Sequence, residues 1–238
     1  MSFKSCKSPF VLRQDSESFL LGTKEAIAEL SSVKTARLLV ISDSHGFFTQ
    51  FQFIVQECGK FYDALVFCGD GAHDLKELLS KSERNSAFKA VLPGVIAFVR
   101  GNNDPASFFV ERENANAESF TPIKCPNAVA FTVASQSVFC THGHEYGVYS
   151  GTEQLKVSAE IFCKQKDISS PALVLFGHTH TPYAKKSQKQ FVLNPGSISL
   201  PRNSSAPSFA SVELSENGIE YTFSKISREK IAPYTAPF

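Results

Sequence analysis

Five short polar motifs in this chain carry side chains that can bind divalent metal ions. They are Asp43-Ser44-His45-Gly46, Asp70-Gly71, Asn102-Asn103-Asp104, His142-Gly143-His144 and His178-Thr179-His180. They hold five of the six histidines, and the sixth, His73, lies three residues beyond Asp70. Carboxylate, imidazole and amide groups without thiolates suit Mn, Fe, Zn and related divalent ions rather than a structural cysteine–zinc site.

An apolar run rich in Val, Leu, Ile and Phe precedes each of these motifs. The runs cover residues 37–42, 64–69, 94–101, 136–141 and 172–177. They lack polar alternation, which is typical of strands buried on both faces. Ligands bind beyond the carboxyl ends of strands in open α/β sheets, because neighbouring loops converge there. We therefore expect the five motifs to meet at one edge and to form a metal site.

Each motif taken singly has a simpler structural explanation. Asp43 and Asp70 could cap helices, and Asn102-Asn103 could be a turn. The recurrence of the pattern after five runs favours the metal site. Seven candidate ligands are too many for one tetrahedral ion and suit two ions with a shared anionic bridge, for which Asp70 is the natural candidate. Such a pair clamps a phosphoryl group, acidifies a bound water and stabilises the attacking and leaving oxygens.

The segments between and after these runs predict an α/β fold. Apolar stripes of helical period lie at Phe47–Cys58, Leu75–Leu79 and Leu155–Phe162, with Thr152 as a candidate N-cap. Alternation of strands and helices is typical of α/β domains. The tail segments 182–187, 190–197, 208–214 and 218–226, and likewise residues 120–142, resemble antiparallel strands. We expect a layered α/β domain with two sheets.

The N-terminal residues follow a different pattern from the rest of the chain. Residues 1–22 are Ser-rich and aperiodic, and Thr23 could cap a short helix with Ala26, Leu30 and Val33 on its apolar face. We expect residues 1–36 to be an N-terminal extension and residues 37–238 to be the main domain.

The composition is that of an ordinary globular protein. The 238 residues are 42% hydrophobic and 20% charged, with a net charge of +1. Residues 37–180 carry 12 basic and 15 acidic side chains. This net negative segment has the wrong sign for a groove that follows nucleic-acid phosphates, unless cations are added. The six cysteines form no CxxC pair, and several lie in apolar runs, which is typical of a reducing compartment. No apolar run approaches the roughly 18–20 residues of a membrane span, and no signal peptide is recognised, so we expect a cytoplasmic protein.

Six motifs, DSH, GDG, RGNND, THGH, GHTH and NPGS, occur in this order between residues 37 and 214. Together they resemble the motifs of the calcineurin-like metallophosphoesterases, most closely those of the YfcE-type phosphodiesterases. The resemblance implies a four-layer α/β/β/α sandwich of two mixed sheets. It also implies two divalent metal ions, commonly Mn²⁺, with Zn, Fe, Ni or Mg as alternatives.

The resemblance further assigns the metal ligands. Asp43, His45, Asp70 and His180 would hold one ion, and Asp70, Asn102, His142 and His178 would hold the other. A hydroxide that bridges the two ions would be the nucleophile, attacking phosphorus in line with the leaving oxygen.

One position departs from the pattern of many family members. Asn103 stands where they have a histidine, and an amide cannot act as a general acid at useful pH. The YfcE-type enzymes also lack this histidine, which favours phosphodiesters or good leaving groups over alkyl monoesters. His73 and His144 are candidates for the missing acid, although either could instead orient a metal ligand. Residues 194–197 could form a tight turn near the site or a simple hairpin connection.

Three functions compete for this sequence. The first is a binuclear metal-dependent phosphodiesterase that hydrolyses a small phosphoester. The second is a scaffold or binding module with a retained metal site, as in a retromer subunit that shares the fold, with residues 1–36 as an interaction arm. The third is a nuclease, against which the acidic middle segment and the lack of a basic, aromatic stretch both argue. The full set of seven ligands favours the phosphodiesterase, and a homo-oligomer stays open.

Overall fold

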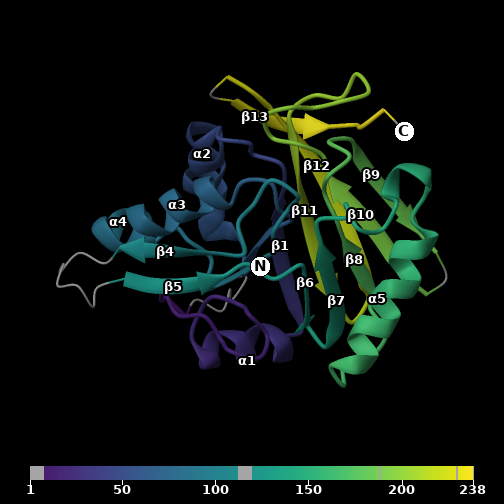
Figure 1. Ribbon diagram of the computed structural model, residues 1–238, viewed down its shortest axis with the longest axis horizontal. Helices are drawn as coiled ribbons and strands as arrows, with labels where there is room; N and C mark the ends of the chain where they lie inside the picture. The colour runs from purple at the N-terminus through teal and green to yellow at the C-terminus, as the bar shows by residue number, and fades with distance from the viewer. Residues whose placement is uncertain (1–7, 112–119, 188, 229, 238) are drawn as a thin grey trace.

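Two β-sheets packed face to face form the centre of the molecule, and helices cover their outer faces (Figure 1). The computed structural model describes residues 8–111, 120–187, 189–228 and 230–237. Within them, the first sheet has the order β13 (Lys230–Tyr234), β12 (Gly218–Ser227), β11 (Ser208–Ser215), β1 (Thr35–Ile41), β2 (Ala64–Phe67) and β3 (Val95–Phe98). The second has the order β6 (Ala128–Val133), β7 (Gln136–Thr141), β8 (Leu173–Leu175), β10 (Phe191–Pro195) and β9 (Pro182–Lys186).

Both sheets are mixed. In the first sheet β1, β2 and β3 run parallel, whereas β11, β12 and β13 pair antiparallel. In the second sheet β8 is parallel to β7 and β10, whereas β6 and β9 pair antiparallel. The predicted tail strands therefore form, but they divide between the two sheets. The strand Lys230–Tyr234 was not predicted.

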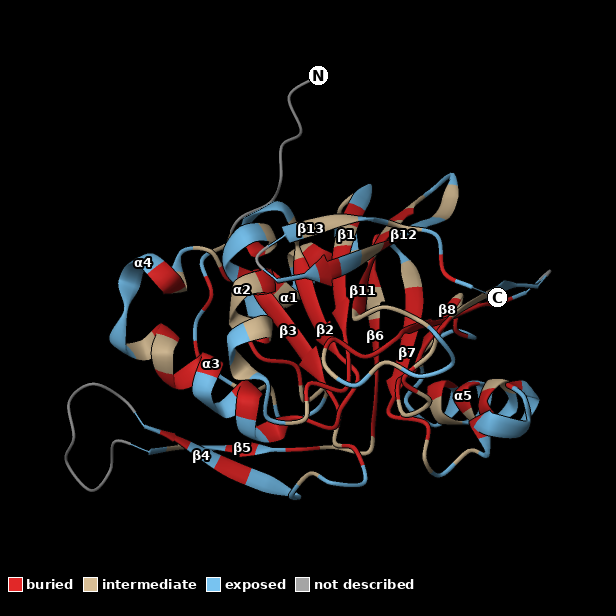
Figure 2. Ribbon diagram, turned by 90° about the horizontal axis from the view of Figure 1, so that it is seen from above, coloured by how far each residue is buried: buried red, intermediate tan, exposed pale blue. Residues whose placement is uncertain are grey.

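The apolar runs predicted as buried strands are buried on both faces. Alternate residues of β1 show this: Leu38 and Val40 pack between the sheets, whereas Leu39 and Ile41 face the helices. The helices α2 (Phe48–Cys58) and α3 (Ala72–Arg84) cover the first sheet, and α5 (Glu153–Gln165) covers the second. Figure 2 shows the strands as a largely buried interior and the helices with exposed outer surfaces. This arrangement confirms the four-layer α/β/β/α sandwich.

The predicted helical stripes are confirmed, with small corrections at their ends. Phe51 and Ile54 of α2, the leucines 75, 78 and 79 of α3, and Leu155 and Ala159 of α5 are buried. Phe47 does not belong to the stripe, because it precedes α2 and is 49% exposed. Thr152 occupies the N-cap position of α5, but its side chain makes no capping hydrogen bond.

The N-terminal segment is packed into the same core. The predicted helix forms as α1 (Lys24–Ser32), with Thr23 Oγ1 accepting from the N–H of Ala26 at 3.0 Å. Leu21 is buried and bridges to Ile96 of β3, while Leu30 of α1 accepts a hydrogen bond from Ala134, just beyond β6. The segment thus closes one side of the sandwich, where the edge strands β3 and β6 lie.

Several shorter elements were not predicted. They are η1 (Gly59–Phe61), α4 (Ser86–Lys89), η2 (Val148–Ser150) and β4 (Ser107–Glu111). β4 pairs antiparallel with β5 (Phe120–Lys124), a strand that lies within the predicted segment 120–142, and the pair packs beside α3. The cysteines 58, 68, 125, 140 and 163 are free, and Cys6 lies outside the described residues. Among the described helices, none has the length and apolar character required to cross a membrane.

Candidate metal centre

The metal-binding motifs meet where the carboxyl ends of both sheets converge. The loop after β1 contacts the loop after β2 through the N–H of Asp43 and the carbonyl of Gly69, at 2.9 Å. It contacts the loop after β8 through the N–H of His178 and Asp43 Oδ2, at 3.1 Å. Three of the five motifs come from the first sheet and two from the second. The predicted convergence therefore occurs between two sheets rather than along one.

Asp43, His45 and His180 form the first ligand cluster. Asp43 Oδ1 lies 3.2 Å from His180 Nε2 and 3.7 Å from His45 Nε2. The two Nε2 atoms lie 3.1 Å apart. One ligand atom from each residue falls within 4.8 Å of the other two, a spacing that could hold one metal ion.

Asp43, Asp70 and His142 form a second cluster that overlaps the first. Asp70 Oδ2 lies 3.4 Å from His142 Nε2 and also 3.7 Å from His45 Nε2. Asp43 belongs to both clusters, and Asp70 faces histidines of both. Both Asp43 and Asp70, rather than Asp70 alone, therefore lie close to ligand atoms of both clusters.

The donor atoms of this centre fit a metal ion. Among the described residues, Asp43 Oδ1 and His142 Nε2 are buried and have no hydrogen-bond partner, which is costly unless a cation satisfies them. His142 Nδ1 contacts the carbonyl of Cys68 at 2.8 Å, and His180 Nδ1 contacts that of Leu200 at 2.6 Å. Because a carbonyl only accepts, Nδ1 carries the proton in both rings, and each Nε2 keeps its lone pair for a metal.

The electrostatics of the centre favour a cation. Burial alone would raise the pKa of Asp70, but the adjacent His142 and the hydrogen bonds from Asn103 together outweigh burial and hold the pKa well below its usual range. Burial likewise opposes ionisation of Asp43, yet the neighbouring imidazoles of His180, His45 and His142 together lower its pKa. Both carboxylates are therefore negative at neutral pH. The carboxylate of Asp43 in turn raises the pKa of His45.

The other two predicted ligands lie in the loops that flank the clusters. The ring centroid of His178 is 5.0 Å from that of His142. Asn102 is exposed in the loop after β3, beside Asn103. The assignment of His178 and Asn102 as ligands stays a prediction.

Two of the three candidate catalytic residues lie beside the clusters. The main-chain N–H and Nδ2 of Asn103 donate to the carboxylate oxygens of Asp70. The ring centroid of His144 lies 5.4 Å from that of His142 and 6.1 Å from that of His178. Burial and the neighbouring His142 lower the pKa of His144.

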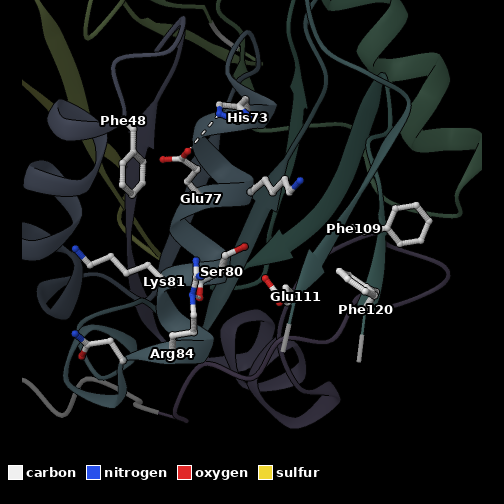
Figure 3. Close-up of a pocket in the computed structure, with 11 residues that line it drawn as sticks. Phe48, His73, Glu77, Ser80, Lys81, Arg84, Phe109, Glu111 and Phe120 are labelled. Carbon is white, nitrogen blue, oxygen red and sulfur yellow. Dashed lines mark hydrogen bonds and ion pairs between the residues drawn. The ribbon is translucent and has the colours of Figure 1, made fainter. Parts of the chain in front are cut away.

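The third candidate, His73, lies on the outer surface of α3. Its side chain is 74% exposed, and Nε2 lies 3.3 Å from Glu77 Oε1. Figure 3 shows both residues at one end of an open groove, which Phe109 of β4 and Phe120 of β5 also line. The groove has a volume of about 610 Å³. His144 therefore lies beside His142 and His178, whereas His73 is exposed and faces Glu77.

Two buried or half-buried carboxylates that the motifs did not single out position the ligand loops. Asp104 accepts from the N–H groups of Asp70, Gly71, Ala72 and Gly101 at 2.8 to 2.9 Å. Asp74 is buried and accepts from Ser44 Oγ and the N–H of Gly46. A signal was available for each, since Asp104 directly follows the Asn pair and Asp74 lies four residues after Asp70.

The segment 194–197 comprises the end of β10 and the start of the connection to β11 in the other sheet, so it is neither a tight turn nor a hairpin connection, and it packs against the site. Ser197 Oγ donates to the carbonyl of Asp43 at 2.7 Å, and Asn194 Nδ2 donates to that of Gly177 at 2.7 Å. Gly196 has a φ of 82°, a conformation that favours glycine. The segment thus links the loops after β1 and β8.

Known proteins resemble this chain in sequence and in fold. "Probable metallophosphoesterase YsnB" of Bacillus subtilis is 25% identical over 186 residues, which span 78% of this chain and 89% of the relative. "Phosphodiesterase YfcE" of Escherichia coli is 25% identical over 185 residues, which span 74% of this chain and 87% of the relative.

Solved structures show the same fold at lower identity. A Streptococcus pneumoniae protein described as a predicted phosphoesterase is 21% identical with a TM-score of 0.54, covering 85% of this chain and 99% of its own. Vacuolar Protein Sorting 29 from Cryptosporidium parvum is 15% identical with a TM-score of 0.59, and the match covers 85% of this chain and 97% of that protein. Residues 37–217 match the family described as the calcineurin-like phosphoesterase superfamily domain, and the motifs DSH, GDG, RGNND, THGH and GHTH supply its clustered side chains. This chain belongs to the calcineurin-like phosphoesterase superfamily.

Proposed function

We propose that the protein is a phosphodiesterase that uses two divalent metal ions, with Mn²⁺ as the first candidate and Zn, Fe, Ni or Mg as alternatives. The observation that carries the proposal is the pair of overlapping Asp–His clusters, which share Asp43. Seven candidate ligand side chains are too many for one tetrahedral ion. Family membership and two relatives named as a metallophosphoesterase and a phosphodiesterase support the same reaction class.

When bound, the two ions would acidify a water molecule, neutralise the phosphoryl oxygens and allow in-line displacement of the leaving alcohol. The protein's own residues hold and orient this centre. Asp43 and Asp70 supply negative charge between the clusters, and Asn103 fixes the rotamer of Asp70 through two hydrogen bonds. Asp104 and Asp74 hold the loops that carry these ligands.

His144 is the side chain best placed to contact the leaving oxygen. Its ring centroid lies 5.4 Å from that of His142 and 6.1 Å from that of His178. Its side chain is 21% exposed, so a substrate can reach it. Its lowered pKa leaves the imidazole neutral at pH 7, which makes it a hydrogen-bond partner rather than a strong acid. Substrates whose leaving group needs little protonation, such as aryl phosphodiesters, are therefore favoured.

Hydrolysis of bis-p-nitrophenyl phosphate by the Mn²⁺-loaded protein tests the proposal. We expect turnover by the wild type and its loss in Asp70→Asn. Glu216→Gln is the matched control, because it makes the same carboxylate-to-amide change in the exposed turn between β11 and β12, at the opposite end of β1 from Asp43. A metal-loaded protein that hydrolyses no member of a broad phosphoester panel would overturn the proposal. Metal analysis of the purified protein, followed by the same panel with each ion, decides between Mn²⁺ and its alternatives.

A scaffold function is the second candidate, since the fold is also that of Vacuolar Protein Sorting 29. That similarity concerns the fold alone. The buried, unpartnered ligand atoms Asp43 Oδ1 and His142 Nε2 support a metal centre under either function, so catalytic turnover rather than metal binding separates the two. Protein-partner capture that persists in Asp70→Asn, together with an inert wild type, would favour the scaffold.

A further inference from the structure

Tyr149 and Arg202 form a hydrogen-bonded pair beside the metal-binding histidines. Tyr149 Oη donates to the carbonyl of His178 at 3.1 Å, and Arg202 Nη1 donates to Tyr149 Oη at 2.9 Å. The main-chain N–H of Arg202 donates to the carbonyl of His180 at 3.1 Å. The ring centroid of Tyr149 lies 5.2 Å from that of His178. The pair is therefore attached to both histidines of the motif after β8.

The loop that carries Arg202 is held in place on both sides. Leu200 accepts from His180 Nδ1 at 2.6 Å, and Asn203 Nδ2 donates to Thr181 Oγ1 at 2.9 Å. Ser205 caps the loop by donating from its N–H to the carbonyl of Arg202 at 3.0 Å. The guanidinium thus projects from a fixed loop, which lowers the entropy that binding would cost.

Arg202 is exposed, and within the described part of the chain it makes no ion pair with a carboxylate. A guanidinium has five N–H donors, and the bond to Tyr149 uses one of them. Tyr149 is 62% exposed, so one side of its ring is open to a ligand that reaches Arg202.

We propose that Arg202 and Tyr149 form a recognition subsite for a second phosphate group of the substrate, beyond the phosphorus that is attacked. This inference rests on the proposed phosphodiesterase function and narrows its substrate class to phosphoesters that carry two phosphates, such as organic diphosphates. The guanidinium fork matches two phosphate oxygens, and the hydroxyl of Tyr149 holds that fork beside the metal centre.

Calorimetric titration of the full-length, Mn²⁺-loaded protein with two non-hydrolysable probes tests the subsite. Methylenediphosphonate carries two phosphonate groups and methylphosphonate carries one, and both are titrated at a matched concentration of free Mn²⁺. We expect the wild type to bind methylenediphosphonate more tightly, and Arg202→Ala to reduce this preference at least tenfold. Arg202→Lys should lose part of the preference, because it keeps the charge but not the fork. Tyr149→Phe should lose part of it too, because the fork is no longer held.

Arg13→Ala is the matched control, since Arg13 is exposed and its carbonyl contacts Gly22 near the start of β3, the opposite end from Asn102. An unchanged ratio of the two dissociation constants in Arg202→Ala and Arg202→Lys, with an unchanged melting temperature, would overturn the subsite. Hydrolysis of bis-p-nitrophenyl phosphate is measured separately. A protein that discriminates the probes but hydrolyses no ester would refute the phosphodiesterase and keep the subsite, whereas an active enzyme with an unchanged ratio would refute the subsite alone.

Discussion

Asn103 donates a hydrogen bond to each oxygen of the Asp70 carboxylate: its main-chain N–H donates to Oδ1 at 2.9 Å and its side-chain Nδ2 donates to Oδ2 at 2.8 Å. The residue from the loop after β3 thereby orients a ligand from the loop after β2. A histidine at this position could have supplied a proton, whereas the amide supplies hydrogen bonds to a carboxylate. The departure from the more common family pattern thus has a structural role in this chain.

Asn103→Ala tests this role. The variant keeps the main-chain hydrogen bond but loses the one to Oδ2, so Asp70 becomes less well oriented. Loss of such an orienting group typically weakens metal binding by about 10- to 100-fold, and we expect the lower end of that range. Calorimetric titration with Mn²⁺ measures the effect. Asn217→Ala, in the exposed turn between β11 and β12, is the matched control, and an equal Mn²⁺ affinity in both variants would contradict the role.

Asp104→Ala should destabilise the fold as well as the site. The carboxylate accepts four main-chain N–H groups from the loops after β2 and β3, and its removal leaves those donors without their partner. A hydrogen bond to a charged group contributes about 1.5–3 kcal/mol, so we expect the free energy of unfolding to fall by roughly 3 kcal/mol or more. Urea denaturation measures this fall. The exposed Glu216→Ala should stay within about 0.5 kcal/mol of the wild type, and a similarly small change in Asp104→Ala would show that the loops hold without it.

The sequence alone was sufficient for the buried strands β1, β2, β3, β7 and β8 and for the loops that carry the candidate ligands, because both are local patterns. A buried run followed by a polar motif identifies the end of a strand, and Asp43, His45 and His142 follow such runs directly. The roles of Asp104 and Arg202 were not predictable in this way. Asp104 binds N–H groups contributed by two loops, and Arg202 meets Tyr149 across 53 residues of chain, so only the folded structure brings these partners together.

The division of the runs between two sheets was also not encoded locally. Buried parallel strands look alike in sequence whichever sheet they join, and the pairing of β1 with β11 or of β8 with β10 depends on contacts between distant segments. The burial of the N-terminal segment was not predictable from the sequence for a related reason. Its buried residues Phe10 and Leu12 alternate with exposed neighbours only from Pro9 to Arg13, which is too short a run to identify an element, and Leu20 follows an irregular stretch.

Metal removal should lower the thermal stability of the protein. A ligand that binds only the folded state at 100 times its dissociation constant stabilises it by about 2.7 kcal/mol. For a chain of this size that corresponds to a rise in melting temperature of roughly 5–10 °C, which a chelator should reverse. His142→Gln should abolish the Mn²⁺-dependent rise, whereas His73→Gln, on the exposed surface of α3, should keep it. A rise that survives in His142→Gln would place the stabilising ion elsewhere.

The N-terminal segment should be required for stability of the fold. Leu21 is fully buried, and its main-chain groups exchange hydrogen bonds of 2.8 and 2.9 Å with Ile96 of β3. Removing a buried leucine side chain typically costs about 2–5 kcal/mol through lost burial and the remaining cavity, so we expect Leu21→Ala to lower the free energy of unfolding by that amount. Val11→Ala, in the same segment but 40% exposed, is the control and should cost well under about 1.5 kcal/mol. Equal midpoints for the two variants in urea would mean that the segment can detach without cost, as an interaction arm would, and a clear separation would mean that it belongs to the core.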